Sequence, residues 1–340
     1  MTTRPFRFGA LTYQPFEGRT WADTARELEA LGYASIALTD HFDAQHAPIP
    51  VAAAVTAATS TLVAATMMLA NDFRHPLVLA KELATLDLMS EGRIEFGIGA
   101  GWKLTDYHRS GIVHDPAGVR IERLMEAIHI IRTAMSGEEF SFAGDHYTVR
   151  DYAALPLPHT PGGPRLAIGA GGRRLLTFAG RVADIVGINP NLGAGGSSVE
   201  GAQDNRRDRF AEKLGWVAEG AAEATDASGA GSLTPLTSDE RADRVDRMSR
   251  IDDIEFTTIM SMVRVVTTAE QRAAAIAEAS ASLRLAEEDI VDMPTLLIGT
   301  VDEIVDALIE RRERFGVSYV VVVPDATRAM APIVERLSGR

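Results

Sequence analysis

The stretch that decides the fold is Arg93-Ile-Glu-Phe-Gly-Ile-Gly-Ala-Gly-Trp102. A short apolar strand runs from Ile94 to Ile98 into a glycine-rich corner that ends in an aromatic residue. The glycines carry no Cβ, so another backbone or a flat ligand can come close to this corner. A strand that ends in this way, in a chain that alternates strands with helices, is typical of the active-site end of an α/β barrel.

Eight short runs predict strands, and several are apolar at nearly every residue, as parallel strands covered on both faces are. The runs cover residues 6–11, 34–39, 61–70, 93–99, 165–169, 183–188, 255–263 and 318–323. Apolar residues at helical spacing predict helices over 21–31, 76–89, 119–135 and 300–315. We therefore predict one (β/α)8 TIM barrel over residues 1–340, with a doubly wound open sheet as the alternative.

Two regions interrupt the alternation of strands and helices. Residues 136–164 and 189–250 are expected to be excursions from the barrel. Long loops in a compact domain are often lids, so residues 192–237 are a candidate lid over the site. A disordered surface insertion is the alternative for the Ala/Gly/Ser/Thr-rich patch at 221–237.

Composition narrows the classes of function. The formal net charge is −13, which argues against nucleic acid as a partner. The chain has no cysteine, so disulfides, thiolate catalysis and thiolate metal sites are excluded. We see no signal peptide, and apolar stretches such as residues 61–70 are too short to span a bilayer. A soluble cytoplasmic protein without a membrane partner is expected.

The second predicted strand ends in Asp40-His41. Such a pair at the carboxyl end of a barrel strand falls on the catalytic rim, where a histidine can serve as acid, base or hydrogen-bond donor. A capping aspartate beside a structural histidine is the alternative. His46 follows at a spacing that does not suit a metal site, and no later strand offers an inward histidine, so no metal is expected.

The fifth predicted strand runs into Gly169-Ala-Gly-Gly172 and then into a helix. Successive backbone N–H groups at a helix N-terminus can bind an anion, and Arg173 or Arg174 can add a charge-assisted contact. The spacing matches neither G-x-G-x-x-G nor a P-loop, so a phosphate site without a Rossmann fold is one interpretation and a plain connection is the other. The chain has no G-x-S-x-G elbow, which leaves a nucleophilic hydrolase with little support.

These pieces, in this order, resemble the bacterial luciferase-like family of flavin- and deazaflavin-dependent oxidoreductases. The resemblance covers roughly residues 6–190 and 254–325. Five groups of motifs carry it: Leu31–Ile36 with Asp40–Phe42, Arg74–Pro76 with Ala80–Glu82 and Leu86-Asp87, Ser90–Arg93 with Gly97–Trp102, Ile168–Gly172 with Ala183–Ile185, and Ile298–Thr300 with Phe315–Val317. The Asp40-His41 pair resembles the branch that uses coenzyme F420, a deazaflavin, because FMN-using relatives more often have a Glu-His pair there.

The resemblance implies a cofactor ring in the barrel mouth, backed by a non-proline cis peptide near Thr66-Met67-Met68. The ring would pass Asn71, Gly99, Ala100 and Gly101, and its phosphate would lie on Gly169, Ala170, Gly171, Gly172 and Arg173. His41 would donate or accept the proton that accompanies hydride transfer. Asp40 would orient His41 or contact the cofactor.

Trp102 departs from the pattern of sugar-phosphate dehydrogenases of the family, which have a Gly-Glu pair where this chain has Gly101-Trp102. Trp102 cannot transfer a proton, so oxidation of a sugar phosphate is not expected. We expect Trp102 to wall an apolar substrate pocket, with Phe42 and Trp21 as neighbours.

The expected function is hydride transfer between F420 and a small organic substrate. The alternatives are an FMN-dependent monooxygenase that uses O2 and reduced flavin supplied by a partner reductase, a metal-dependent barrel hydrolase, and a barrel that binds flavin or deazaflavin without catalysis. A homodimer is the default for such barrels.

Overall fold

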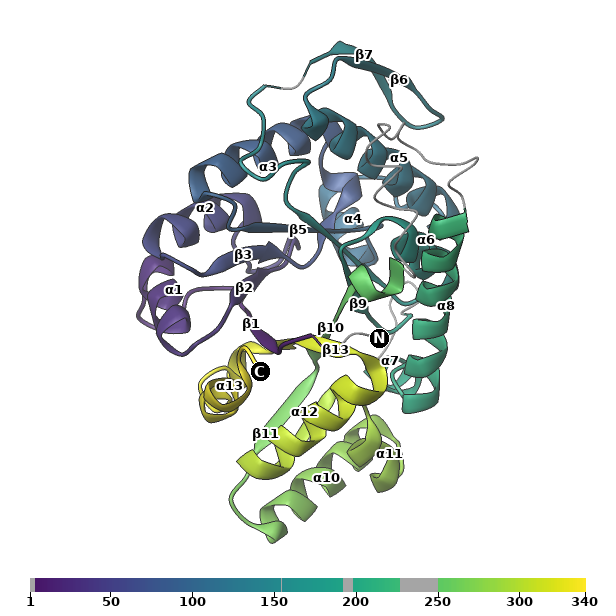
Figure 1. Cartoon of the computed structure of the whole chain (residues 1–340). Coiled ribbons are helices and arrows are strands. Elements are labelled where there is room, and N and C mark those ends of the chain that lie inside the picture. Colours follow the sequence, from purple (N-terminus) through teal and green to yellow (C-terminus); the bar gives the residue numbers. More distant parts are fainter. Residues whose placement is uncertain (1–3, 154, 192–197, 227–249) are drawn as a thin grey trace.

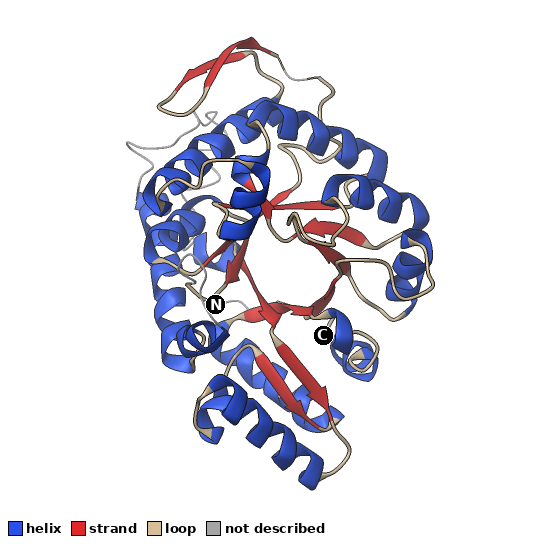
Figure 2. Cartoon of the chain, turned by 180° about the vertical axis from the view of Figure 1, so that it is seen from behind, coloured by secondary structure: helices blue, strands red, loops and turns tan. Residues whose placement is uncertain are grey.

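A computed structural model describes residues 4–153, 155–191, 198–226 and 250–340. Its parallel strands form a closed ring with helices around the outside (Figures 1 and 2). The barrel strands are β1 (Arg7–Leu11), β2 (Ser35–Leu38), β3 (Val63–Thr66) continued by β4 (Leu69–Ala70), β5 (Ile94–Gly99), β8 (Arg165–Ala170), β9 (Ile185–Ile188), β10 (Glu255–Met260) and β13 (Val317–Val322). Strand β1 pairs with β13 and β3 pairs with β5, which closes the ring. The predicted (β/α)8 barrel is confirmed.

The third barrel strand is broken. A cis peptide joins Met67 to Met68, between β3 and β4, and both pieces pair with β5. The non-proline cis bond expected near Thr66-Met67-Met68 is therefore present.

The helices predicted from apolar spacing are present within a few residues of their expected ends. The helices around the barrel and its excursions are α1 (Trp21–Ala30), α2 (Pro48–Ala58), α3 (Pro76–Ser90), α4 (Leu104–Ser110), α5 (Ala117–Ser136), α6 (Arg173–Val182), α7 (Ser198–Asp204), α8 (Arg207–Asp226), α10 (Ala269–Leu283), α11 (Glu287–Asp292), α12 (Val301–Phe315) and α13 (Ala331–Leu337). A capping box begins α12, because Thr300 and Glu303 each accept the other's backbone N–H. No helix in the described part of the chain is long and apolar enough to cross a membrane.

The first excursion contains an antiparallel hairpin of β6 (Phe140–Ala143) and β7 (Thr148–Tyr152), which lies outside the ring of helices (Figure 1). Glu126 on α5 holds its turn, because its carboxylate accepts the N–H groups of Asp145, His146 and Tyr147 at 2.8–3.1 Å. The eight strands predicted from the sequence did not include β6 or β7.

Much of the second excursion is helix. Helix α8 packs on α6, and the two helices approach most closely at Gly180 and Gly220, where an added Cβ would overlap the carbonyls of Val217 and Thr177. The first residues of the Ala/Gly/Ser/Thr-rich patch at 221–237 continue α8, and Ala221 is fully buried in the main core. The remainder of the candidate lid, at residues 192–197 and 227–237, lies outside the described residues.

The predicted strand 255–263 is two strands. Strand β10 ends at Met260, and β11 (Met262–Val265) leaves the barrel to pair with β12 (Leu296–Gly299). This pair and helices α10 and α11 share a small core of their own, in which Ile276, Ile290 and Leu296 are buried.

The amino-terminal end of the barrel is closed by side chains. Arg7 and Arg165 each lie 2.7–3.1 Å from carboxylate oxygens of both Glu95 and Glu255. Above this four-residue ionic ring, a buried apolar layer fills the barrel interior; it consists of Leu11, Ala37, Met67, Ala167, Ile185, Tyr319 and Val321. A surface pocket borders Arg7, Arg165 and Glu255 outside this ring, but the ring and the apolar layer separate it from the carboxyl end of the strands.

Candidate active site

A cavity of about 690 Å³ opens at the carboxyl ends of the barrel strands. That volume lies within the usual range for small-molecule sites, and this end is where TIM barrels carry their active sites. Every barrel strand supplies part of the lining, through Tyr13, His41, Met68, Gly99 to Trp102, Gly169 to Arg173, Asn189, Ser261 and Val323.

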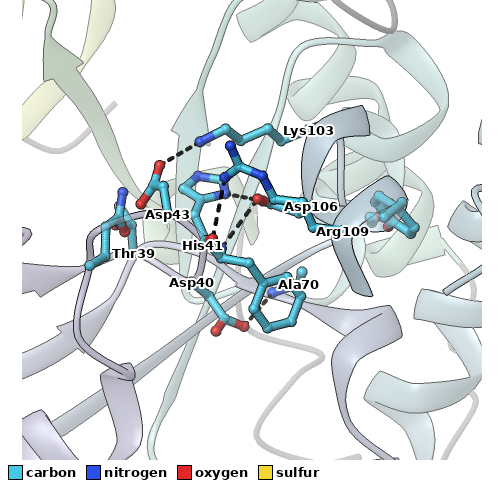
Figure 3. Close-up of polar contacts among 12 residues, drawn as sticks. Thr39, Asp40, His41, Asp43, Ala70, Lys103, Asp106 and Arg109 are labelled. Carbon is cyan, nitrogen blue, oxygen red and sulfur yellow. Dashed lines mark hydrogen bonds and ion pairs between the residues drawn. The ribbon is translucent and has the colours of Figure 1, made fainter. Parts of the chain in front are cut away.

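His41 contacts a carboxylate that the sequence did not point to. Its Nδ1 lies 2.7 Å from Oδ2 of Asp106, in the first turn of α4 (Figure 3). The other oxygen of Asp106 accepts the backbone N–H of Phe42 at 3.2 Å. Asp106 is buried, whereas the His41 side chain keeps 20% of its surface exposed and lines the cavity.

Asp40 lies beside His41 in the chain but does not contact its ring. Its carboxylate binds Arg74 through two hydrogen bonds of 2.6 and 3.2 Å and accepts the N–H of Ala70 at 3.1 Å. The expectation that Asp40 orients His41 is corrected, because Asp106 occupies that place. Asp40 does line the cavity, so its expected contact with a cofactor stays a prediction.

Met68 and three glycines shape the floor of the cavity. A Cβ on Gly97 would overlap the Thr66 carbonyl and the Met68 sulfur, and one on Gly169 would lie 3.0 Å from the Met68 side chain. A Cβ on Gly99 would lie 3.7 Å from Met68. Because these glycines lack a Cβ, the Met68 side chain fits against them and the space above it stays open.

The glycine-rich turn after β8 lines the cavity beside this floor. Gly171 touches the loop after β9, because an added Cβ would lie 2.5 Å from the backbone of Pro190 and Asn191. Gly172 is the N-cap of α6 and provides no side-chain cap, so the first N–H groups of α6 lack an intrahelical partner. Such N–H groups suit an anion.

The loop after β9 is held from behind by a buried lysine. Lys213 on α8 is fully buried, and its ammonium donates to the carbonyl of Asn189 at 2.8 Å and to the Asp204 carboxylate at 2.6 Å. Burial lowers the pKa of Lys213, although Asp204 opposes that shift. The loop that borders the glycine turn thus has a rigid support.

A family model described as luciferase-like monooxygenase matches residues 1–319. The chain belongs to this family. Its curated relatives include two F420-dependent glucose-6-phosphate dehydrogenases, from Nakamurella multipartita (34% identical over 198 residues) and from Microbacterium testaceum (34% over 191 residues). Each match covers 54% of this chain and 56% of the relative, so the chain spans about half the length of the curated relatives it matches.

Two solved structures share the fold. A coenzyme F420-dependent tetrahydromethanopterin reductase from Methanopyrus kandleri has a TM-score of 0.70 at 18% identity, over 98% of both chains. An F420-dependent secondary alcohol dehydrogenase, solved with an F420–acetone adduct, has a TM-score of 0.68 at 18% identity, over 98% of both chains.

Most of the residues expected in the site of this luciferase-like chain line the cavity. These are Asp40, His41, Met67, Met68, Gly99, Ala100, Gly101, Trp102, Gly169, Ala170, Gly171, Gly172 and Arg173. Trp102 keeps 46% of its surface exposed, and the centroids of its ring and the His41 ring lie 5.8 Å apart, edge to face.

Four of the expected residues do not line the cavity. The Thr66 hydroxyl bonds to the backbone of Gly97, and Asn71 donates to the Tyr147 hydroxyl at 3.3 Å. The Phe42 ring packs on Phe73, and the Trp21 indole donates to His46 at 2.8 Å. The ring that Trp102 contacts is that of His41, and neither Phe42 nor Trp21 lies with it in the cavity lining.

Sequence reasoning missed Asp106, Tyr13 and Lys213. An aspartate in the first turn of a helix is ordinary, because it complements the helix dipole. A lysine on an amphipathic helix is expected to face solvent. Neither residue type in those places signals a role in the site.

Proposed function

We propose that this luciferase-like protein is an F420-dependent oxidoreductase that transfers a hydride between the deazaflavin and a small organic substrate. One arrangement carries the proposal: a proton-transferring histidine and a helix N-terminus lie on the wall of a single open cavity. The names of the curated relatives agree with it, although their matches cover only half of each protein.

The described residues suit a tricyclic ring with a phosphate tail. The floor between Met68 and Gly99 has no side chain on its glycine side, which leaves space for a flat ring. Gly171, Gly172 and the first N–H groups of α6 would hold the phosphate. Arg173 and Arg174 line the same end of the cavity and already pair with Glu219 and Glu122 at 3.0 and 2.7 Å. The site therefore binds the phosphate chiefly through backbone donors.

The bound cofactor supplies the hydride chemistry, and the chain supplies binding, orientation and proton transfer. His41 holds or accepts the proton of the substrate oxygen, since its ring lines the cavity beside Trp102. Trp102 and Tyr13 cover the mouth with apolar surface and exclude water from the reacting atoms.

The substrate we propose is uncharged. Among the described residues, each cationic side chain that lines the cavity already has a partner. Besides the two arginines above, Lys103 pairs with Asp43 at 2.6 Å, and Arg120 donates to the carbonyls of Ala100 and Asp115. A neutral alcohol or carbonyl compound fits this wall better than a sugar phosphate.

Titration with oxidised F420 and with FMN tests the cofactor. We expect saturable binding of F420 at least about tenfold tighter than binding of FMN, a difference of about 1.4 kcal/mol. Tighter binding of FMN would instead favour the flavin-dependent monooxygenase. His41→Asn should bind F420 as the wild type does, because His41 is assigned to the proton and not to cofactor binding.

A substrate panel tests the second part of the proposal. F420 reduction is followed by its visible absorbance with neutral secondary alcohols and with glucose 6-phosphate. Turnover of glucose 6-phosphate, with no turnover of the neutral alcohols, would contradict the proposal that the substrate is uncharged. Light scattering of the protein as it elutes from a size-exclusion column would measure the oligomeric state, for which a homodimer is expected.

A further inference from the structure

We propose that Asp106 is a positioning residue that fixes the tautomer of His41, so that Nε2 is the atom that exchanges the substrate proton. The contact between Asp106 and His41 stands on geometry alone. Its catalytic consequence rests on the proposed function.

Both oxygens of Asp106 are used as acceptors. Oδ1 accepts the N–H of Phe42 at 3.2 Å, and Oδ2 lies 2.7 Å from Nδ1 of His41. An ionised carboxylate has no proton to donate, so Nδ1 of His41 must be the donor. A neutral His41 therefore carries its proton on Nδ1 and has a free lone pair on Nε2.

Helix α4 holds Asp106 rigidly against the loop after β2. Asp106 accepts from the N–H of Phe42, and Arg109, one turn further on, donates to the carbonyl of the same residue at 3.3 Å. Tyr107 anchors the same turn from its other side, because its hydroxyl donates to Asp72 at 2.9 Å. The carboxylate thus reaches His41 from a helix that is tied down at several points.

Two other aspartates lie near His41 in the sequence, and both have cationic partners. Asp40 binds Arg74, and Asp43 lies 2.6 Å from the Lys103 ammonium (Figure 3). Among the described carboxylates, Asp106 is the one within hydrogen-bond distance of the His41 ring.

The fixed tautomer has a defined chemical consequence. In the oxidation of an alcohol, the carbon–hydrogen bond delivers its hydride to the oxidised deazaflavin, and the hydroxyl proton goes to Nε2 of neutral His41. In the reverse direction, the carbonyl takes the hydride from the reduced deazaflavin and the proton from Nε2 of the imidazolium. In both directions Nδ1 of His41 keeps its proton and donates the hydrogen bond to Asp106.

Long-range proton–nitrogen NMR of the protein labelled with ¹⁵N-histidine tests the tautomer without substrate or cofactor. The signal of His41 is assigned by its loss in His41→Asn. We expect neutral wild-type His41 to be protonated at Nδ1. Asp106→Asn keeps the shape but offers an amide N–H to Nδ1, so the proton should move to Nε2. Asp302→Asn is the matched control, because Asp302 is exposed and pairs with Arg336 on the far side of α12.

Protonation of wild-type His41 at Nε2 would overturn the proposal, whether or not Asp106→Asn folds. So would unchanged nitrogen shifts in a folded Asp106→Asn protein. If the tautomer is as expected but F420 does not bind, the positioning role of Asp106 stands and the proposed function fails.

Kinetics on a substrate found with the panel supply the second readout. We expect Asp106→Asn to lower kcat by about 10²–10⁴-fold, the usual worth of a positioned acid or base. KM and the Kd for F420 should change less than about threefold, because Asp106→Asn leaves the shape of the cavity, and so the binding of substrate and cofactor, unchanged. Asp106→Glu should recover part of kcat, and the pH dependence of kcat should shift in Asp106→Asn. An equal loss in F420 affinity would indicate a merely structural role.

Discussion

Asp40 and Arg74 form a bidentate pair at the rim of the barrel, with Oδ2 of Asp40 2.6 Å from Nη1 and Oδ1 3.2 Å from Nη2 of Arg74. The Asp40 side chain is 8% exposed and that of Arg74 is 21% exposed. The pair joins the loop after β2 to the chain that follows β4, where Asp40 also accepts the N–H of Ala70.

Arg74→Met should therefore destabilise the protein, because it leaves Asp40 buried without its cation. We expect a loss of about 3 kcal/mol in the free energy of unfolding, measured with urea. Arg26→Met is the matched control, since the Arg26–Asp23 pair is exposed and contributes about 0–1 kcal/mol. Equal losses in the two variants would contradict the structural role of the rim pair.

Gly171→Ala should weaken cofactor binding by about tenfold or more, or about 1.4 kcal/mol. The added Cβ would lie 2.5 Å from the backbone of Pro190 and Asn191, so the glycine turn and the loop after β9 would have to separate. The Kd for F420 measures the effect. Gly215→Ala in α8 is the control, because its Cβ would meet open space, and it should stabilise the protein by about 0.5–1 kcal/mol. Unchanged F420 affinity in Gly171→Ala would place the phosphate elsewhere.

The four-residue ionic ring at the base of the barrel should make stability depend on pH. Burial alone would raise the pKa of Glu255, but Arg7 and Arg165 lower it below its ordinary value. A carboxyl with a lowered pKa stabilises the fold above its unfolded pKa of about 4.3, and that stabilisation is lost as pH falls through the folded pKa.

Glu255→Gln tests this dependence. Near pH 7 the variant should be less stable than the wild type by about 3 kcal/mol, because Arg7 and Arg165 lose a buried partner. The difference should shrink as pH falls below about 4.3, where protonated Glu255 resembles glutamine. Urea unfolding from pH 7 to pH 3 gives the measurement. A difference independent of pH would show that lost packing, not charge, is responsible.

Lys213→Met should loosen the loop after β9. The methionine keeps the apolar stem but loses the hydrogen bonds to Asn189 and Asp204. We expect a lower free energy of unfolding and weaker F420 binding, with the His41 tautomer unchanged because Lys213 contacts the loop after β9 and not His41 or Asp106. An altered His41 signal would show that the two walls are coupled.

The barrel could be predicted because its strands and helices have strong local signals. Buried parallel strands are apolar on nearly every residue, and helices such as α12 have capping residues that act locally. The split of the seventh strand at Ser261 could not be predicted, because β-branched and apolar residues typical of strands continue from β10 into β11 and only tertiary pairing separates the two.

The site was predicted where it depends on main-chain shape and missed where it depends on contacts between distant elements. Glycines at 97, 99, 169 and 171 are visible in the sequence and do border the cavity or its floor. The partner of His41 comes from α4, the helix that follows β5, the fourth barrel strand. Sequence spacing is no guide to this partner, since Asp40 and Asp43 are nearer to His41 in the chain. The tertiary packing of α4 decides which of Asp40, Asp43 and Asp106 contacts the His41 ring.

Because the base of the barrel is closed, the cavity has one entrance, at the carboxyl ends of the strands. The ionic ring and the apolar layer above it prevent passage along the axis, so every ligand enters and departs between the strand ends. A cofactor that rests on the floor must then arrive before its substrate and cannot depart until the product has gone. Initial-rate kinetics with both reactants varied would accordingly follow a compulsory order, in which the substrate binds the form that holds the incoming cofactor and the product leaves the form that holds the spent cofactor.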